Sequence, residues 1–162
     1  MHKILFVCHG NICRSPMAEF VMKKIVKDAG LEDQFLIESA ATSSEEVWNG
    51  VGNPVYPPAK KKLAEHGISC EGKRAYQMKA SDYDKYDYIV VMERRHIRAI
   101  DRYIHKDTEG KVKLLLSYAG HGVDGDTSRD EVDDPWYSGD FQATWEDVNE
   151  GCRGLLDHIL GK

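Results

Sequence analysis

The stretch that decides this fold is Phe6-Val7-Cys8-His9-Gly10-Asn11-Ile12-Cys13-Arg14-Ser15-Pro16. A continuous apolar run, Ile4–Val7, leads into it, and apolar residues near helical spacing follow from Pro16. Such a run is typical of a central strand that is buried on both faces. Pro16 suits the first turn of a helix, because the N–H that proline lacks would have no partner there. The stretch is therefore predicted to be a tight loop between a buried strand and a helix.

The loop has the pattern Cys-x5-Arg-Ser, with a thiol at Cys8 and a guanidinium at Arg14. A strand-to-helix loop turns backbone N–H groups inward, and the helix adds its positive dipole end, so the loop is predicted to bind a phosphate. Arg14 offers a planar fork for two oxygens. Gly10 and Asn11 tolerate the left-handed backbone angles of a tight loop. We expect Cys8 to ionise there without a histidine base, with Ser15 as a hydrogen-bond donor to its sulfur.

Plainer interpretations apply to each part of this motif. A cysteine after an apolar run is most often a small buried hydrophobe. Cys8 and Cys13 are spaced like a pair of metal ligands, but the sequence has no second pair with ligand spacing, and no metal site is predicted. Neither interpretation explains the cysteine, Gly-Asn, arginine and Ser-Pro together.

The segment Val7–Glu19 resembles the signature of the low-molecular-weight protein tyrosine phosphatases, and the resemblance runs through most of the chain. It implies that Cys8 is the nucleophile, that Arg14 binds phosphate and that Ser15 steadies the departing sulfur. It also implies that the loop amides hold the non-bridging oxygens, which involves His9, Gly10, Asn11, Ile12 and Cys13. No cofactor is expected, because Arg14 and the amides supply the positive charge.

Length and composition limit the number of domains, the class of partner and the compartment of the protein. A chain of 162 residues suggests one domain, residues 1–162. With 22 Lys and Arg against 27 Asp and Glu, nothing favours nucleic acid as a partner. The apolar run near the N-terminus is too short for a signal peptide or a membrane span. Four cysteines, one in a reactive loop, favour a reducing compartment, so we expect a cytoplasmic protein, with export by a non-classical route left open. Monomer and weak homodimer are both left open.

Strand and helix patterns alternate along the chain, which predicts a parallel α/β sheet with right-handed crossovers. We expect a doubly wound, flavodoxin-like sheet of four strands with helices on both faces, and a ligand at the carboxyl end of the first strand. The resemblance implies the strand order 2-1-3-4. The predicted elements are strands at Ile4–Val7, Phe35–Ile37, Tyr86–Met92 and Val112–Leu116, helices at Pro16–Ala29, Pro54–His66, Glu93–Tyr103 and Phe141–Leu160, and a Gly/Asp/Ser-rich loop at His121–Glu131.

A polar loop, Ala41–Asn53, contains Trp48. Either this tryptophan folds back onto the core, as tryptophans often do, or it is a rim aromatic that packs against an aryl substrate. The resemblance favours the rim. It also implies a network around Asn11 and Ser39 that supports the loop. Many relatives have a histidine in that network where this chain has Lys73, and this departure puts the network in doubt.

The segment Asp134-Pro135-Trp136-Tyr137 has two interpretations. Asp-Pro is most often a plain turn. The resemblance instead implies that Asp134 is the general acid that protonates the leaving oxygen, and that Trp136 and Tyr137 flank a flat ring. Asp133 is the nearest rival for the acid. Glu131 and Asp133 are expected to favour the protonated form of Asp134 by repulsion between like charges.

The arginines of the segment Glu93–Tyr103 are expected to form a solvated basic face, because charged side chains are mostly exposed. They are Arg94, Arg95, Arg98 and Arg102. Cys13 has two open interpretations. It is either a packing residue or a partner that forms a reversible disulfide with Cys8 under oxidant.

The function predicted from the resemblance is hydrolysis of phosphotyrosine in proteins, and of aryl phosphates, through a phosphocysteine on Cys8, with phosphate as a product inhibitor. Thioredoxin-linked arsenate reductases are similar in the first loop but need a downstream cysteine pair, which Cys70 and Cys152 do not supply. Arginine phosphatases of this fold carry Thr where this chain has Ile12. A non-enzymatic anion-binding module would have no use for both Cys8 and Asp134.

Overall fold

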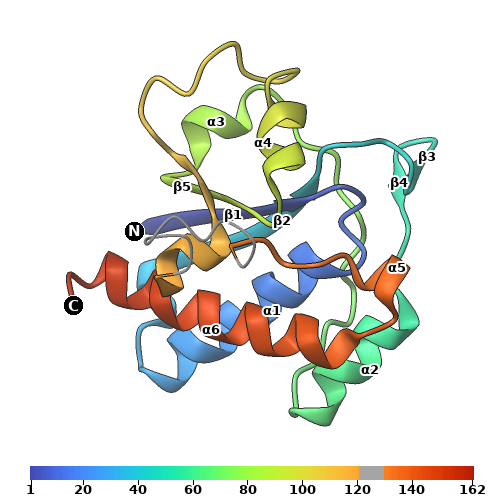
Figure 1. Cartoon of the computed structure of the whole chain (residues 1–162), viewed down its shortest axis with the longest axis vertical. Helices are drawn as coiled ribbons and strands as arrows, with labels where there is room; N and C mark the ends of the chain where they lie inside the picture. Colours follow the sequence, from blue (N-terminus) through green and yellow to red (C-terminus); the bar gives the residue numbers. More distant parts are fainter. Residues whose placement is uncertain (121–129) are drawn as a thin grey trace.

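A parallel sheet of four strands, in the order β2-β1-β5-β6, forms the centre of the fold (Figure 1). The computed structural model describes residues 1–120 and 130–162, so most of the loop predicted at 121–131 lies outside the described residues. Counted within this sheet alone, the order is 2-1-3-4, which confirms the prediction. The strands are β1 (His2–Cys8), β2 (Phe35–Ala41), β5 (Tyr88–Val91) and β6 (Val112–Leu114).

The central strand β1 is buried on both faces, as its apolar run predicts. Ile4 and Phe6 belong to the core on one side of the sheet, and Leu5 and Val7 belong to the core on the other. Burial of each such side chain contributes about 1.5–3 kcal/mol, so the strand is firmly anchored. Its last residue, Cys8, is therefore held at a fixed place at the carboxyl end of the sheet.

Helices cover both faces of the sheet (Figure 1). On one face lie α1 (Arg14–Asp28), α2 (Pro57–Glu65) and the long α6 (Phe141–Ile159). On the other lie α3 (Asp82–Lys85) and α4 (Arg94–Ile100). The doubly wound α/β class is thereby confirmed. Within the described part of the chain, no helix combines the length and the apolar character needed to cross a membrane.

Several elements are shorter than predicted, namely the third strand (Tyr88–Val91) and the helices α2 (Pro57–Glu65) and α4 (Arg94–Ile100). Two further boundaries differ for packing reasons. The fourth strand ends at Leu114, and its last predicted residues form a 3₁₀ turn, Leu115–Ala119. Helix α6 lies against this turn so closely that a Cβ on Gly154 would fall 2.3 Å from the carbonyl oxygen of Tyr118. Strand β2 extends to Ala41, because it continues to pair with β1 as far as Cys8.

The predicted polar loop contains an antiparallel hairpin, β3 (Val47–Trp48) and β4 (Val51–Gly52). Its turn is Asn49-Gly50, with φ of 49° and 77°. Asn-Gly is a strong two-residue hairpin signal, and the sequence interpretation passed over it. A second short element, α5 (Pro135–Ser138), begins directly after Asp134 and was also not predicted.

Candidate active site

The loop between β1 and α1 turns its carbonyl groups outward. The carbonyl oxygens of Cys8, His9, Ile12 and Cys13 accept backbone N–H groups from Thr42, Ser43, Tyr56 and Met17, respectively, at 2.9–3.1 Å. In a trans peptide the C=O and the following N–H point in opposite directions. These outward bonds therefore aim the amides of the next residues at the inside of the loop, as a nest for an anion requires.

A cavity of about 220 Å³ opens inside this loop. Every loop residue from Cys8 to Arg14 lines it, including the five that were predicted to bind phosphate. The rest of its wall comes from the segment before β3, from α4 and from the segment that begins α5, and consists of Glu45, Glu46, Arg95, Asp134, Trp136 and Tyr137. The structure thus brings Cys8, Arg14 and Asp134 together around one cavity.

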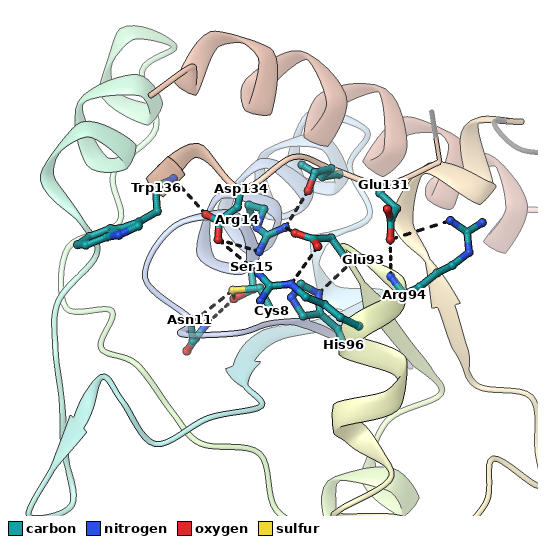
Figure 2. A network of polar contacts seen from close by, with 12 residues as sticks. Cys8, Asn11, Arg14, Ser15, Glu93, Arg94, His96, Glu131, Asp134 and Trp136 are labelled. Atoms are coloured by element: carbon teal, nitrogen blue, oxygen red, sulfur yellow. Dashed lines mark hydrogen bonds and ion pairs between the residues drawn. The ribbon is translucent and has the colours of Figure 1, made fainter. Parts of the chain in front are cut away.

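The sulfur of Cys8 lies among hydrogen-bond donors. Asn11 donates its backbone N–H to Sγ at 3.3 Å, and the Oγ of Ser15 lies 3.0 Å from Sγ. The same Oγ accepts from Nδ2 of Asn11 at 2.7 Å, which leaves the hydroxyl proton of Ser15 available to the sulfur (Figure 2). Such contacts stabilise a thiolate.

Asn11 is the left-handed residue of the loop, with φ of 60°. Its side chain holds it in place, because Nδ2 also donates to Oγ of Ser39 at 2.9 Å and Oδ1 accepts the backbone N–H of Tyr76 at 2.9 Å. Gly10 was expected to share this conformation but does not have a positive φ. A Cβ on Gly10 would lie 3.2 Å from Cγ of Glu46, so the close approach of that side chain favours glycine.

A second layer supports Asn11 and includes the unusual lysine. Ser39 donates from Oγ to Oε1 of the buried Glu19 at 2.6 Å. Lys73 donates from Nζ to the carbonyl oxygen of Ser39 at 3.0 Å and lies 3.3 Å from Oε1 of Glu19. The doubt about this network, raised by the absence of a histidine, is therefore corrected: the ammonium of Lys73 takes part in a complete chain of contacts.

Arg14 is 2% exposed, and its guanidinium is held from three sides (Figure 2). One terminal nitrogen donates to the carbonyl oxygen of Val132 at 2.7 Å and also to Oε1 of Glu93. The other lies 3.4 Å from Oδ2 of Asp134. Burial acts to raise the pKa of Glu93, but the attraction of Arg14 and Arg95 outweighs it and lowers this pKa below its ordinary value.

Asp134 caps α5, and its Oδ1 accepts the backbone N–H of Trp136 at 3.0 Å. Its two acidic neighbours lie in different surroundings, and the repulsion expected from them stays a prediction. Glu131 accepts the backbone N–H of Arg94 at 2.7 Å, and Figure 2 shows it facing that residue. Asp133 is exposed. Two guanidinium groups surround Asp134, because Arg95 also lies 3.4 Å from Oδ2.

The three aromatic residues predicted at the rim lie in different places. Trp136 and Tyr137 line the cavity, and Trp136 packs against the ring of Tyr56 at a centroid distance of 4.8 Å. Tyr137 is 83% exposed. Trp48 is 74% exposed on the β3–β4 hairpin and does not belong to the described lining of the cavity. It therefore does not fold back onto the core, and its contact with an aryl substrate stays a prediction.

Sequence reasoning missed two charged residues of the site, Glu93 and Arg95. Both follow β5 directly, and carboxyl ends of neighbouring parallel strands meet at one edge of a sheet, so their position was a usable signal. Of the arginines predicted to form a solvated basic face, Arg95, Arg98 and Arg102 are exposed and Arg94 is half-buried, but several have partners that were not predicted. Arg95 lines the cavity, Arg94 pairs with the buried Asp130, and Arg102 donates to the carbonyl oxygen of Thr42 at 2.8 Å.

Two further groups near the cavity have shifted pKa values. Burial, followed by the nearby Cys8, raises the pKa of Cys13 to about 12, which keeps it a thiol at neutral pH. Burial, followed by the charge of Arg14, lowers the pKa of His96 to about 2. Its Nδ1 accepts the backbone N–H of Glu93 at 3.1 Å. Within residues 1–120 and 130–162, no group of three or more His, Cys, Asp or Glu side chains is arranged to hold a metal ion.

Comparison with known proteins gives consistent matches over the full chain. The family model "Low molecular weight phosphotyrosine protein phosphatase" matches residues 3–162. The low molecular weight protein-tyrosine-phosphatase YfkJ of Bacillus subtilis is 34% identical over 159 residues, which cover 98% of this chain and 96% of that protein. Its crystal structure superposes with a TM-score of 0.89. The low molecular weight phosphotyrosine protein phosphatase of Sus scrofa is 36% identical, with 96% and 94% covered.

One similar solved structure is named for a different activity. The crystal structure titled "DARP, drosophila arginine phosphatase" is 29% identical, covers 97% of both chains and superposes with a TM-score of 0.82. The fold is thus shared by proteins whose names state different phosphoryl groups.

Proposed function

This chain belongs to the low molecular weight phosphotyrosine protein phosphatase family, and from that premise we propose that it hydrolyses phosphotyrosine in proteins, and small aryl phosphates, through a phosphocysteine on Cys8. One observation supports this assignment most strongly. Cys8, Arg14 and Asp134 line the same cavity, and the loop around the sulfur turns its amides inward. A nucleophile, an anion clamp and a proton donor are what the cleavage of a phosphate ester needs.

In the first step, the thiolate of Cys8 attacks phosphorus in line with the leaving oxygen. The sulfur–phosphorus bond forms as the phosphorus–oxygen bond to the aryl group breaks, and Asp134 gives its proton to that oxygen. Arg14 and the loop amides hold the three non-bridging oxygens, where charge must be neutralised throughout the transfer. Asp134 leaves this step as a carboxylate.

In the second step, a water molecule attacks the phosphocysteine. Asp134 now acts as the base that accepts a proton from the water, and the sulfur–phosphorus bond breaks as the new oxygen–phosphorus bond forms. Ser15 lies 3.0 Å from the sulfur and stabilises the returning thiolate by a hydrogen bond. Inorganic phosphate is the product, and it competes with substrate because it fits the same cradle.

The walls of the cavity favour an aryl ester. Trp136 and Tyr137 stand at its rim and offer flat faces to the ring of phosphotyrosine. A phosphoserine has no ring to place between them. The described residues therefore support phosphotyrosine over phosphoserine as the physiological group.

The test is hydrolysis of an aryl phosphate in the presence of a metal chelator. We compare wild type with Cys8→Ser and Asp134→Ala, using Cys152→Ser, a substitution in the core away from the cavity, as the control. Cys8→Ser should abolish turnover and Asp134→Ala should lower it by about 10²-fold or more, which is what a positioned proton donor contributes. Wild-type activity that requires added metal, or activity that survives in Cys8→Ser, would refute the proposal.

A competition assay shows which phosphorylated residue the enzyme prefers as its substrate. Phosphotyrosine, phosphoserine and phosphoarginine are offered at equal concentration, and released phosphate is assigned to each. Phosphotyrosine should have the highest kcat/KM. A preference for phosphoarginine would place this chain with the activity stated for the similar Drosophila protein, and would leave the phosphocysteine step intact.

A further inference from the structure

Arg95 joins two carboxylates of the active site. Its Nε donates to Oε2 of Glu93 at 2.9 Å, and a terminal nitrogen donates to Oδ2 of Asp134 at 3.4 Å. Arg14 contacts the same two residues, Glu93 by hydrogen bond and Asp134 at 3.4 Å. The four side chains form a ring of alternating charge, of which Figure 2 shows Arg14, Glu93 and Asp134 meeting beside Cys8. Nothing in the resemblance or in the motifs assigned a role to Arg95.

Arg14 is shared between this ring and a bound substrate. One of its terminal nitrogens is already committed to the carbonyl oxygen of Val132 and to Glu93. The other terminal nitrogen lies beside Asp134 and belongs, with Nε, to the fork that holds phosphoryl oxygens. A bound substrate therefore competes with Asp134 for this part of the guanidinium.

Arg95 is not subject to that conflict. Its Nε is tied to Glu93, two residues earlier in the chain and at the start of the same helix, so its direction does not depend on Asp134. It lies on the wall of the cavity rather than in the loop that holds the phosphoryl group. Its contact with Asp134 can therefore persist through both steps of the reaction.

Building on the proposed function, we propose that Arg95 is a positioning residue that holds the Oδ2 side of the Asp134 carboxyl group in the place from which it exchanges protons with the leaving and attacking oxygens. The backbone N–H of Trp136 holds Oδ1 at 3.0 Å, so Arg95 supplies the second point that fixes the plane of the carboxyl group. Each carboxyl oxygen has another lone pair for the transferred proton.

The experiment compares two esters that differ in their need for a proton. The p-nitrophenolate of p-nitrophenyl phosphate leaves readily without gaining a proton. The phenolate of phenyl phosphate is a poorer leaving group and needs the proton. In Arg95→Gln, kcat/KM for phenyl phosphate should fall about tenfold, a part of what a proton donor contributes, and for p-nitrophenyl phosphate by less than about threefold. Inhibition by inorganic phosphate should stay unchanged, because the cradle is intact.

Two further variants make the outcome decisive. Arg98→Gln removes an exposed arginine one turn along the same helix and should behave as wild type with both esters. Arg95→Lys keeps the charge and should recover part of the loss; it also provides the comparison if Arg95→Gln does not fold. Equal losses with the two esters, or no loss, would overturn the positioning role. Failure of the wild type to hydrolyse either ester would instead overturn the proposed function.

Discussion

The ammonium nitrogen of Lys73 lies 3.3 Å from Oε1 of Glu19, directly behind the residues that hold the phosphate loop. Glu19 in turn accepts from Ser39, which accepts from the left-handed Asn11. A buried carboxylate is costly unless it is paired, so this lysine has a structural task. The loop is therefore stabilised by a charge that lies outside the cavity.

Substitution of Lys73 by Met should destabilise the fold by about 2 kcal/mol, because a buried carboxylate loses one of its cations while Lys23 remains at 2.6 Å. Urea unfolding measures this change. The control is Lys24→Met, which removes an exposed lysine that pairs with Asp28 on the helix surface and should cost less than about 0.5 kcal/mol. Similar losses in the two variants would show that the Lys73 pair contributes no more than a surface pair.

Ser15→Ala should slow the second step more than the first, because the hydroxyl stabilises the sulfur as it departs as a thiolate. A hydrogen bond to a charged group contributes about 1.5–3 kcal/mol, which corresponds to a loss of about tenfold to a hundredfold in kcat. Stopped-flow measurement with an aryl phosphate should show a larger initial burst of phenol than in wild type. A slower steady state without any gain in burst would contradict this role.

Because His96 is buried as a neutral ring, we predict that the free energy of unfolding falls in acid. Burial and the nearby Arg14 lower its pKa to about 2 from an ordinary value of 6.5, so the folded protein keeps the ring neutral while the unfolded chain protonates it below about pH 6.5. Unfolding then takes up a proton, and the free energy of unfolding falls as the pH falls. This residue alone should cost about 2 kcal/mol between about pH 7.5 and about pH 5.

His96→Asn removes this dependence, because the asparagine Oδ1 can accept the backbone N–H of Glu93 without titrating. Urea unfolding of both proteins at the two pH values gives the difference. The variant should lose about 2 kcal/mol less than wild type over that range. Parallel losses would mean that His96 is not the group that takes up the proton.

Cys13→Ser should leave aryl-phosphate hydrolysis nearly intact and should impair recovery from peroxide. The pKa of Cys13 is raised to about 12, so it does not compete with Cys8 as a nucleophile, and it is buried in the same loop. An oxidised Cys8 that condenses with it is protected from over-oxidation. Recovery of activity after peroxide and added thiol is the measurement, and equal recovery in both proteins would leave Cys13 as a packing residue.

Much of the fold and the heart of the site could be predicted from local patterns. The apolar run before Cys8 and the proline after Ser15 mark a strand, a loop and a helix, and the structure has all three. The fourth strand was predicted too long, because the turn at 115–119 is imposed by contact with α6, which is distant in sequence. Local patterns carry no record of such contacts.

The residues that sequence reasoning missed act through tertiary contacts. Glu93 meets Arg14 across a separation of 79 residues, and Arg95 meets Asp134 across a separation of 39. The support of Asn11 by Lys73 likewise needs the fold to bring the two together. Because a charged residue on a helix is usually solvated, nothing in the spacing of the four arginines distinguished the one that lines the cavity.

The proposed mechanism requires covalent transfer of a phosphoryl group to the sulfur of Cys8, and a rapid acid quench during turnover of an aryl phosphate traps that intermediate. Mass spectrometry of the quenched wild type should find one added phosphoryl group, on the peptide that contains Cys8, with more of it in Ser15→Ala and none in Cys8→Ser. Continued hydrolysis by wild type with Cys8 never phosphorylated, or with the group on another residue, would contradict the account.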